Sequence, residues 1–198
     1  MNQDGERIQT MISHPPSVYH STLDTPIGRI FIGSTDQGIC EISLDASGWD
    51  EFTDKLNKSP GAPAIHPAGP RHDDIRRQLT EYFSRQRRVF EIALAVTGTA
   101  FQKRVWRALT TIPYGETWSY RQVAAVCGQP QAFRAVGQAN RVNPVPIVVP
   151  CHRVIGANGT LTGYAGGLEI KKALLALEGV TSNKEPETSN QKRATRNE

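Results

Sequence analysis

Cysteine is scarce in this sequence, and long apolar runs are lacking. Only three cysteines occur among 198 residues, at positions 40, 127 and 151. They are too few and too scattered for the disulfide framework of a small secreted protein or for a four-cysteine zinc site. No apolar stretch approaches the ~20 residues that a membrane helix needs, and the polar N-terminus does not resemble a secretory signal. We therefore expect an intracellular protein outside the membrane, cytoplasmic or, in a eukaryote, nuclear.

Acidic side chains are sparse in the second half of the chain. Residues 99–180 hold nine Lys or Arg and only three Asp or Glu, a net charge of +6, whereas residues 1–98 carry a net charge of −3. A basic half suggests a polyanionic partner such as nucleic acid, although an ordinary solvated surface would have the same composition. Hydrophobic residues make up 38% of the chain, which is enough for the core of one domain or two small ones.

The first half has the patterns of a small α/β unit. Short β-rich runs are separated by the turn sequences TPIG and DQG, and an amphipathic stretch follows a proline-rich one. These patterns predict strands over 17–24, 29–35 and 39–45, a loop over 58–70, a helix over 73–86 and a further strand over 89–96. We expect a flexible arm over 1–16 and an antiparallel-sheet α/β domain over 17–96.

The second half is predicted to be mainly helical. Thr99 and Ser119 are suitable N-caps for two of its helices. The helices are predicted over 99–112, 119–127, 131–141 and 168–178. The second and third, joined at Cys127–Gly128–Gln129, fit a helix-turn-helix, so we expect a winged-helix-like domain over 99–180 and a disordered tail over 181–198. The fold class is therefore α+β.

A cysteine and a histidine stand side by side at Cys151 and His152, just after the apolar run that starts at Ile147. A thiolate is a strong nucleophile, and a neighbouring base or positive charge can generate it at neutral pH. An isolated pair of this kind is more often a small buried cysteine with a chance neighbour. The pair alone leaves both interpretations open.

The wider sequence resembles the O6-alkylguanine-DNA alkyltransferases. The motif PCHRV at 150–154 is preceded by RAVGQANR and NPVPIVVP and followed by GYAGGLEIKKALLALE. The resemblance is strongest over 99–179 and extends back to about residue 17. It implies that the protein repairs double-stranded DNA by flipping out the damaged nucleotide. The alkyl group of O6-alkylguanine, and less readily of O4-alkylthymine, would pass irreversibly to the protein's own cysteine, in a single turnover by a monomer without a cofactor.

The resemblance also implies roles for individual residues. Cys151 is the acceptor, His152 takes the thiol proton through a water, Glu178 orients the histidine, and Asn143 braces the turn before the active-site strand. From position alone, Glu178 would be a solvated helix end and Asn143 a helix terminator before a proline. The implied base pocket consists of Tyr120, Pro146, Val154, Tyr164 and Ala165. The implied DNA contacts are Arg134, which fills the vacated stack, Ala135, Gly137, Asn140 and Arg141.

Two positions depart from some relatives. Ala165 replaces a serine, so that a hydroxyl contact to O6 is lost, and Asn140 replaces a methionine, so that apolar packing is lost. Some relatives also bind zinc in the first domain, but the histidines here have no ligand-like spacing, and we predict no metal site.

Two other functions are compatible with parts of the pattern. A lesion sensor would bind alkylated DNA without reacting and recruit excision repair, but such proteins replace the acceptor cysteine, which is present here. A Cys-His-Glu hydrolase would use the same three side chains, but no oxyanion-hole loop is evident and a helix-turn-helix is predicted.

Overall fold

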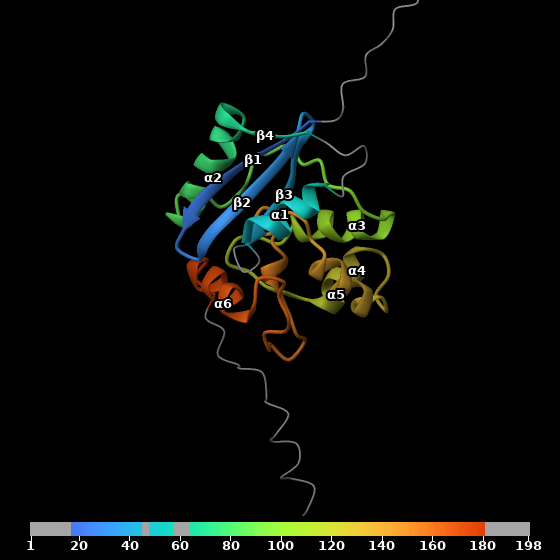
Figure 1. The fold of residues 1–198 in the computed structure, drawn as a ribbon. Coiled ribbons are helices and arrows are strands. Elements are labelled where there is room, and N and C mark those ends of the chain that lie inside the picture. Colours follow the sequence, from blue (N-terminus) through green and yellow to red (C-terminus); the bar gives the residue numbers. More distant parts are fainter. Residues whose placement is uncertain (1–16, 45–47, 58–63, 181–198) are drawn as a thin grey trace, which may run out of the picture.

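The computed structural model describes residues 17–44, 48–57 and 64–180 (Figure 1). Its first half is built on a sheet in which β1 (Ser17–Thr25), β2 (Gly28–Thr35) and β3 (Gly38–Leu44) form the predicted antiparallel meander. A fourth strand, β4 (Ala64–Pro67), pairs parallel with β1, so the strand order is β3-β2-β1-β4. The arm, the tail and the end of the third predicted strand lie outside the described residues.

Two elements of the first half differ from the sequence prediction. Part of the stretch predicted as a loop over 58–70 is β4, an edge strand, where a proline costs few ladder hydrogen bonds. Helix α1 (Gly48–Asn57) was not predicted. Its signals are Phe52 and Leu56, four residues apart and buried, and acidic residues in the first turn with Lys55 in the last.

The prediction of a strand over 89–96 is wrong. This segment makes a single bridge, between Leu94 and Ile39, with hydrogen bonds from the Ile39 amide to Ala93 O (2.9 Å) and from the Ala95 amide to Ile39 O (2.8 Å). The edge of β3 cannot pair along its length because the amide of Ile42 donates to Pro144 O instead, at 2.7 Å. The edge of β3 is therefore shared between the segment 93–95 and Pro144.

Helix α2 (Asp73–Phe83) packs against β1 and buries Ile75, Leu79 and Tyr82. It begins where the periodicity predicts but ends three residues earlier. Arg85 takes a left-handed backbone conformation (φ 60°), which a helix cannot contain.

The helices of the second half are α3 (Ala100–Leu109), α4 (Tyr120–Val126), α5 (Phe133–Arg141) and α6 (Leu168–Leu177). Thr99 and Ser119 are N-caps, as expected, because each side chain accepts a hydrogen bond from the backbone amide of the glutamine three residues on. The side chain of that glutamine accepts in return from the backbone amide of the cap residue, which completes a capping box. Helices α3, α4 and α5 pack together (Figure 1). The helix-turn-helix and the winged-helix likeness stay predictions. No helix in the described ranges combines the length and apolar character that a bilayer span requires.

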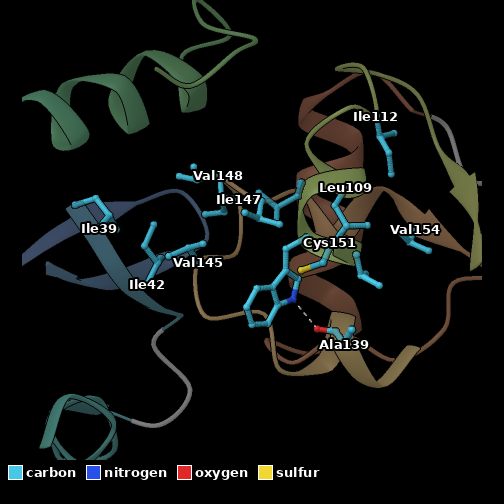
Figure 2. Packing of buried hydrophobic residues seen from close by; sticks show 14 of the residues in the cluster. Ile39, Ile42, Leu109, Ile112, Ala139, Val145, Ile147, Val148, Cys151 and Val154 are labelled. Carbon is cyan, nitrogen blue, oxygen red and sulfur yellow. Dashed lines mark hydrogen bonds between the residues drawn. The ribbon is translucent and has the colours of Figure 1, made fainter. Parts of the chain in front are cut away.

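One apolar cluster runs through both halves of the molecule. Ile39 and Ile42 of β3 pack with Val145 and Val148, next to the helices of the second half (Figure 2). Within those helices, the indole Nε1 of Trp106 on α3 donates to the backbone oxygen of Ala139 on α5, at 2.9 Å. The sheet therefore supports the segment that precedes Cys151. The domain limits 17–96 and 99–180 stay predictions.

Candidate active site

The chain between α5 and Cys151 is a turn and not the predicted strand. Ile147 lies in the left-handed region (φ 75°), which is costly for a β-branched residue. Pro146 and Val149 form an isolated bridge, and Cys151–Arg153 forms a single 3₁₀ turn, η3. The next strand, Val154–Ile155 (β6), pairs parallel to β5 (Trp118–Ser119). Prolines at 144, 146 and 150 explain the difference, because each removes a backbone donor that a strand would need.

Asn143 holds this turn together. Its Oδ1 accepts from the amide of Val145 at 3.1 Å, and its Nδ2 lies 2.8 Å from the oxygen of Val149 and 3.1 Å from Sγ of Cys151. One side chain thus spans the turn and reaches the sulfur at its end. Because Ile147 lies inside this span, the hydrogen bonds of Asn143 help to maintain its strained backbone.

The Cys151 thiol is almost completely buried, with 5% of the residue exposed. Burial raises its pKa, since a low-dielectric surrounding disfavours the thiolate. The hydrogen bond from Asn143 and the positive charge of Lys171 oppose this rise but do not cancel it. The resting residue is therefore a thiol at neutral pH, and a base must remove its proton before it can act as a nucleophile.

His152 and Glu178 are buried together, with Nε2 of the ring 2.8 Å from Oε1 of the carboxyl. Burial pushes the pKa of Glu178 up, but hydrogen bonds from His152 and Arg153 outweigh it and hold this pKa at about 2. The carboxylate can only accept, so Nε2 carries the hydrogen and Nδ1 has the free lone pair. Nδ1 is buried and has no partner among the described residues. Burial also lowers the pKa of His152, so the ring is neutral and able to take a proton.

Glu178 accepts hydrogen bonds from several groups in addition to His152. It accepts from the hydroxyl of Tyr82 (2.7 Å), from Nε and Nη2 of Arg153 (2.8 and 3.0 Å), and from the amide of Gly115 (3.3 Å). Arg153 also donates to the backbone oxygen of Ile112 at 2.6 Å. These donors explain how a carboxylate can follow α6 at its C-terminal end, where the helix dipole opposes negative charge.

Lys171 is a feature that the sequence analysis missed. It is fully buried on α6, and its Nζ donates to the oxygens of Val154 (2.6 Å) and Thr162 (3.1 Å). Burial lowers its pKa to about 8, and the sulfur of Cys151 acts in the opposite direction. Its position on the face of α6 that holds Leu174 and Leu175 was the available signal. The Val154 oxygen that accepts from Lys171 has a second lone pair, and the expected contact of Val154 with a base stays a prediction.

A cavity of about 480 Å³ opens beside Cys151. One wall belongs to the first half of the chain and includes Glu41, Ser43 and Lys55. The structure brings seven of the predicted site residues to this cavity: Asn140, Arg141, Asn143, Pro146, Cys151, Tyr164 and Ala165.

The glycine-rich loop that forms one side of the cavity packs tightly against the sheet. A Cβ atom at Gly166 would lie 2.8 Å from Cδ1 of Leu44, so a larger residue would push the loop away from β3. Gly167 has a positive φ of 89°, a conformation that suits glycine. The two glycines thus fix the position of Tyr164 and Ala165 in the cavity wall.

The remaining predicted residues lie outside the cavity lining. His152, Val154 and Glu178 are buried. Tyr120 begins α4 and packs beside Gly137 of α5, and its hydroxyl accepts from Oγ1 of Thr162 at 3.1 Å. Arg134 and Ala135 are exposed on α5. Within the described ranges, no three His, Cys, Asp or Glu residues gather in a way that could hold a metal.

Comparisons with known proteins cover both halves. Residues 18–96 match the ribonuclease-like domain of 6-O-methylguanine DNA methyltransferase, and residues 100–180 match its DNA binding domain. The chain is 43% identical over 164 residues to the constitutive methylated-DNA–protein-cysteine methyltransferase of Bacillus subtilis, which covers 82% of this chain and 96% of that protein. It is 44% identical over 161 residues to the methyltransferase of that name from Mycolicibacterium paratuberculosis, over 81% and 92% of the two chains.

A solved structure extends this likeness to three dimensions. The crystal structure of Mycobacterium tuberculosis OGT in complex with DNA superposes with a TM-score of 0.70 at 41% identity, over 81% of this chain and 92% of that one. Sequence and fold thus agree along nearly the whole length of these relatives. This chain belongs to the 6-O-methylguanine DNA methyltransferase family.

Proposed function

We propose that this protein repairs DNA by transferring the alkyl group of O6-alkylguanine, and less readily of O4-alkylthymine, irreversibly to Sγ of Cys151. The observation that carries the proposal is the set of contacts around the sulfur. A buried thiol faces a cavity, Asn143 donates to it, and the adjacent neutral His152 is backed by an ionised Glu178. The names of the relatives, methylated-DNA–protein-cysteine methyltransferases, support the same activity.

The chemistry follows from these groups. A sulfur–carbon bond forms at the alkyl carbon while the bond from that carbon to O6 breaks and its electron pair passes to the guanine. The thiol proton moves through a water to Nδ1 of His152, and Glu178 stabilises the imidazolium until the proton passes to the departing guanine. Cys40 on β3 and the half-buried Cys127 after α4 lie in other elements and cannot restore the thiol from a stable thioether. Each molecule therefore acts once.

The DNA would bind on the helical side of the molecule. Arg134 and Arg141 are exposed on α5, and Arg104 and Arg121 are exposed on α3 and α4. The alkylated oxygen is inaccessible within a stacked duplex, so the nucleotide must be extruded before it can reach Cys151. We place the protein in the cytoplasm, where the bacterial and archaeal relatives have their DNA.

The test of this function is the intact mass of the protein after incubation with a duplex that contains O6-methylguanine. We expect a permanent gain of one methyl group per protein, located at Cys151, and none from the unmodified duplex. Tight binding with an unchanged mass would support the lesion sensor instead. Repeated removal of alkyl groups by an unchanged protein would support the hydrolase.

Replacing Arg134 with Ala is expected to slow repair of duplex DNA much more than reaction with free O6-benzylguanine, both measured at saturation in single turnover. Arg134 would fill the space of the extruded nucleotide, and the free base needs no extrusion. Arg121 provides a matched control, because both guanidinium groups lie over the ring of Phe133, at 5.0 Å for Arg121 and 5.9 Å for Arg134. Arg121→Ala should only weaken binding and reduce its salt dependence by about one counterion. Equal slowing of the Arg134 variant on both substrates would contradict the extrusion role.

A further inference from the structure

Tyr82 carries a buried hydroxyl that the proposed mechanism does not use. It lies on α2, in the first half of the chain, is 0% exposed, and donates to Oε1 of Glu178 at 2.7 Å. Nε2 of His152 lies 2.8 Å from the same oxygen. The hydroxyl and the imidazole therefore share one acceptor atom, so the strength of one hydrogen bond affects the other.

The surroundings of Tyr82 fix its hydroxyl in this position. The ring packs against those of Phe83, Phe90 and Tyr114, with centroids 5.3, 5.5 and 6.1 Å away. Burial and the negative charge of Glu178 both raise the pKa of Tyr82, so the phenol keeps its proton. The hydroxyl is thus a permanent donor to Oε1 at neutral pH.

A second donor changes how strongly a carboxylate oxygen attracts the first. A hydrogen bond to Oε1 of Glu178 stabilises the negative charge there, so that the oxygen holds Nε2–H of His152 less strongly. Burial lowers the pKa of His152, and the hydrogen bond and charge of Glu178 raise it. Because Tyr82 weakens the effect of Glu178, it favours the neutral ring, which is the form that can take the thiol proton.

Other charged groups also act on His152. The positive charges of Arg153, on the same turn, and of Lys171, on α6, lower its pKa, in the direction opposite to Glu178. Three further groups of the site are uncharged at neutral pH, because burial raises the pKa of each: Cys151, Tyr120 and Tyr164. Tyr82 therefore acts on a ring whose charged neighbours are Arg153, Lys171 and Glu178.

Arg153 orients the carboxylate of Glu178 independently of Tyr82. Its Nε donates to Oε2 at 2.8 Å and its Nη2 to Oε1 at 3.0 Å, so that the guanidinium binds both oxygens. A bidentate pair of this kind fixes the geometry of a carboxylate. Removal of the Tyr82 hydroxyl would therefore change the strength of Oε1 as an acceptor and leave the carboxylate in place.

We propose that Tyr82 is a positioning residue in the first half of the chain that sets the basicity of His152 through their shared acceptor, Oε1 of Glu178. The inference rests on the proposed function, in which His152 takes the thiol proton. It gives the first half of the chain a part in the chemistry as well as in the fold. Without the hydroxyl, Oε1 would bind Nε2–H more tightly, and the ring would become protonated at a higher pH.

The experiment compares wild type with Tyr82→Phe, which keeps the ring and removes only the hydroxyl. Histidine NMR gives the pH at which His152 is half protonated and the chemical shift of its Nε2 proton. Single-turnover transfer from free O6-benzylguanine gives the pH dependence of the reaction without DNA binding. In Tyr82→Phe, the Nε2 proton should move downfield, and the midpoint of both pH profiles should rise by about 1 pH unit. At the wild-type midpoint the variant should then react about 5-fold more slowly, with equal rates well above it.

Tyr114→Phe provides a matched control. The hydroxyl of Tyr114 donates to the backbone oxygen of Leu177 at 3.0 Å, and its ring lies beside that of Tyr82. The same atom is thus removed next to the carboxylate without loss of a hydrogen bond to it, and both profiles should stay as in wild type. Placing 3-fluorotyrosine at position 82 makes the opposite change. Its hydroxyl is a stronger donor, so the midpoint should move to lower pH, and this variant provides the test if Tyr82→Phe does not fold.

The outcomes separate this inference from the function on which it rests. If the Nε2 proton and both profiles of Tyr82→Phe equal those of wild type, the inference is overturned and the proposed function stands. Transfer that falls by one factor at every pH, with the Nε2 proton unmoved, would show a structural role only and would also overturn it. If wild type gains no methyl group from O6-methylguanine, the proposed function fails, and the NMR measurement still reports on Tyr82 because it needs no transfer.

Discussion

Replacing Cys151 with Ala is expected to abolish alkyl transfer and to leave binding to alkylated duplex DNA nearly unchanged. The sulfur is the proposed acceptor, and the side chain that remains has no nucleophile. The residue is only 5% exposed, so its loss removes little contact area. Intact mass measures transfer, and fluorescence anisotropy with a labelled O6-methylguanine duplex measures the dissociation constant.

Two controls make this result specific. Cys151→Ser keeps an acceptor for the Nδ2 of Asn143 but has a weak nucleophile, so it should bind DNA like wild type and transfer no alkyl group on the same time scale. Cys127→Ala should transfer normally, because Cys127 lies at the end of α4 and does not line the cavity. Methyl transfer by Cys151→Ala would show that another residue is the acceptor.

Local signals in the sequence predicted helices α2 to α6 and the meander, but not α1. The capping residues Thr99 and Ser119 mark helix starts because their hydrogen bonds reach only three residues along the chain. The predictions of a loop where β4 lies and of a strand over 89–96 are wrong because sheet pairing depends on residues that are distant in sequence. Whether an extended segment joins a sheet depends on which edge is free, and the edge of β3 is partly occupied by Pro144, about a hundred residues away in sequence.

The candidate site also combines local contacts, which the sequence predicts, with long-range contacts, which it does not. The segment from Asn143 to Cys151 is short, and its sequence motif identified the sulfur and the residue that contacts it. The contact of Tyr82 with Glu178 joins residues 96 positions apart, and no periodicity encodes it. The contribution of the first half was therefore opaque in the sequence. In the structure, β3 and α2 hold the turn, the glycine-rich loop and the carboxylate in place.

Replacing Glu178 with Gln is expected to destabilise the fold by about 3–5 kcal/mol and to slow transfer severely. The family resemblance implies only an orienting role for this residue. In the structure, its carboxylate also neutralises the buried guanidinium of Arg153 and accepts from Tyr82 on α2. A neutral amide would leave that charge unpaired and would not stabilise a protonated His152. Transfer is measured at a temperature where the variant is fully folded, and stability by chemical denaturation.

The pH dependence gives a second readout for Glu178. Its pKa is lowered from 4.5 to about 2 in the folded protein, so its stabilising effect is present above about pH 4.5 and is lost as the pH falls toward 2. The difference in unfolding free energy between wild type and Glu178→Gln should therefore shrink over that range. Tyr82→Phe removes one hydrogen bond and keeps the carboxylate, so it should cost only about 1 kcal/mol and preserve the pH dependence. A stable Glu178→Gln variant with normal transfer and an unchanged pH profile would show that the carboxylate neither holds the two halves together nor supports the histidine.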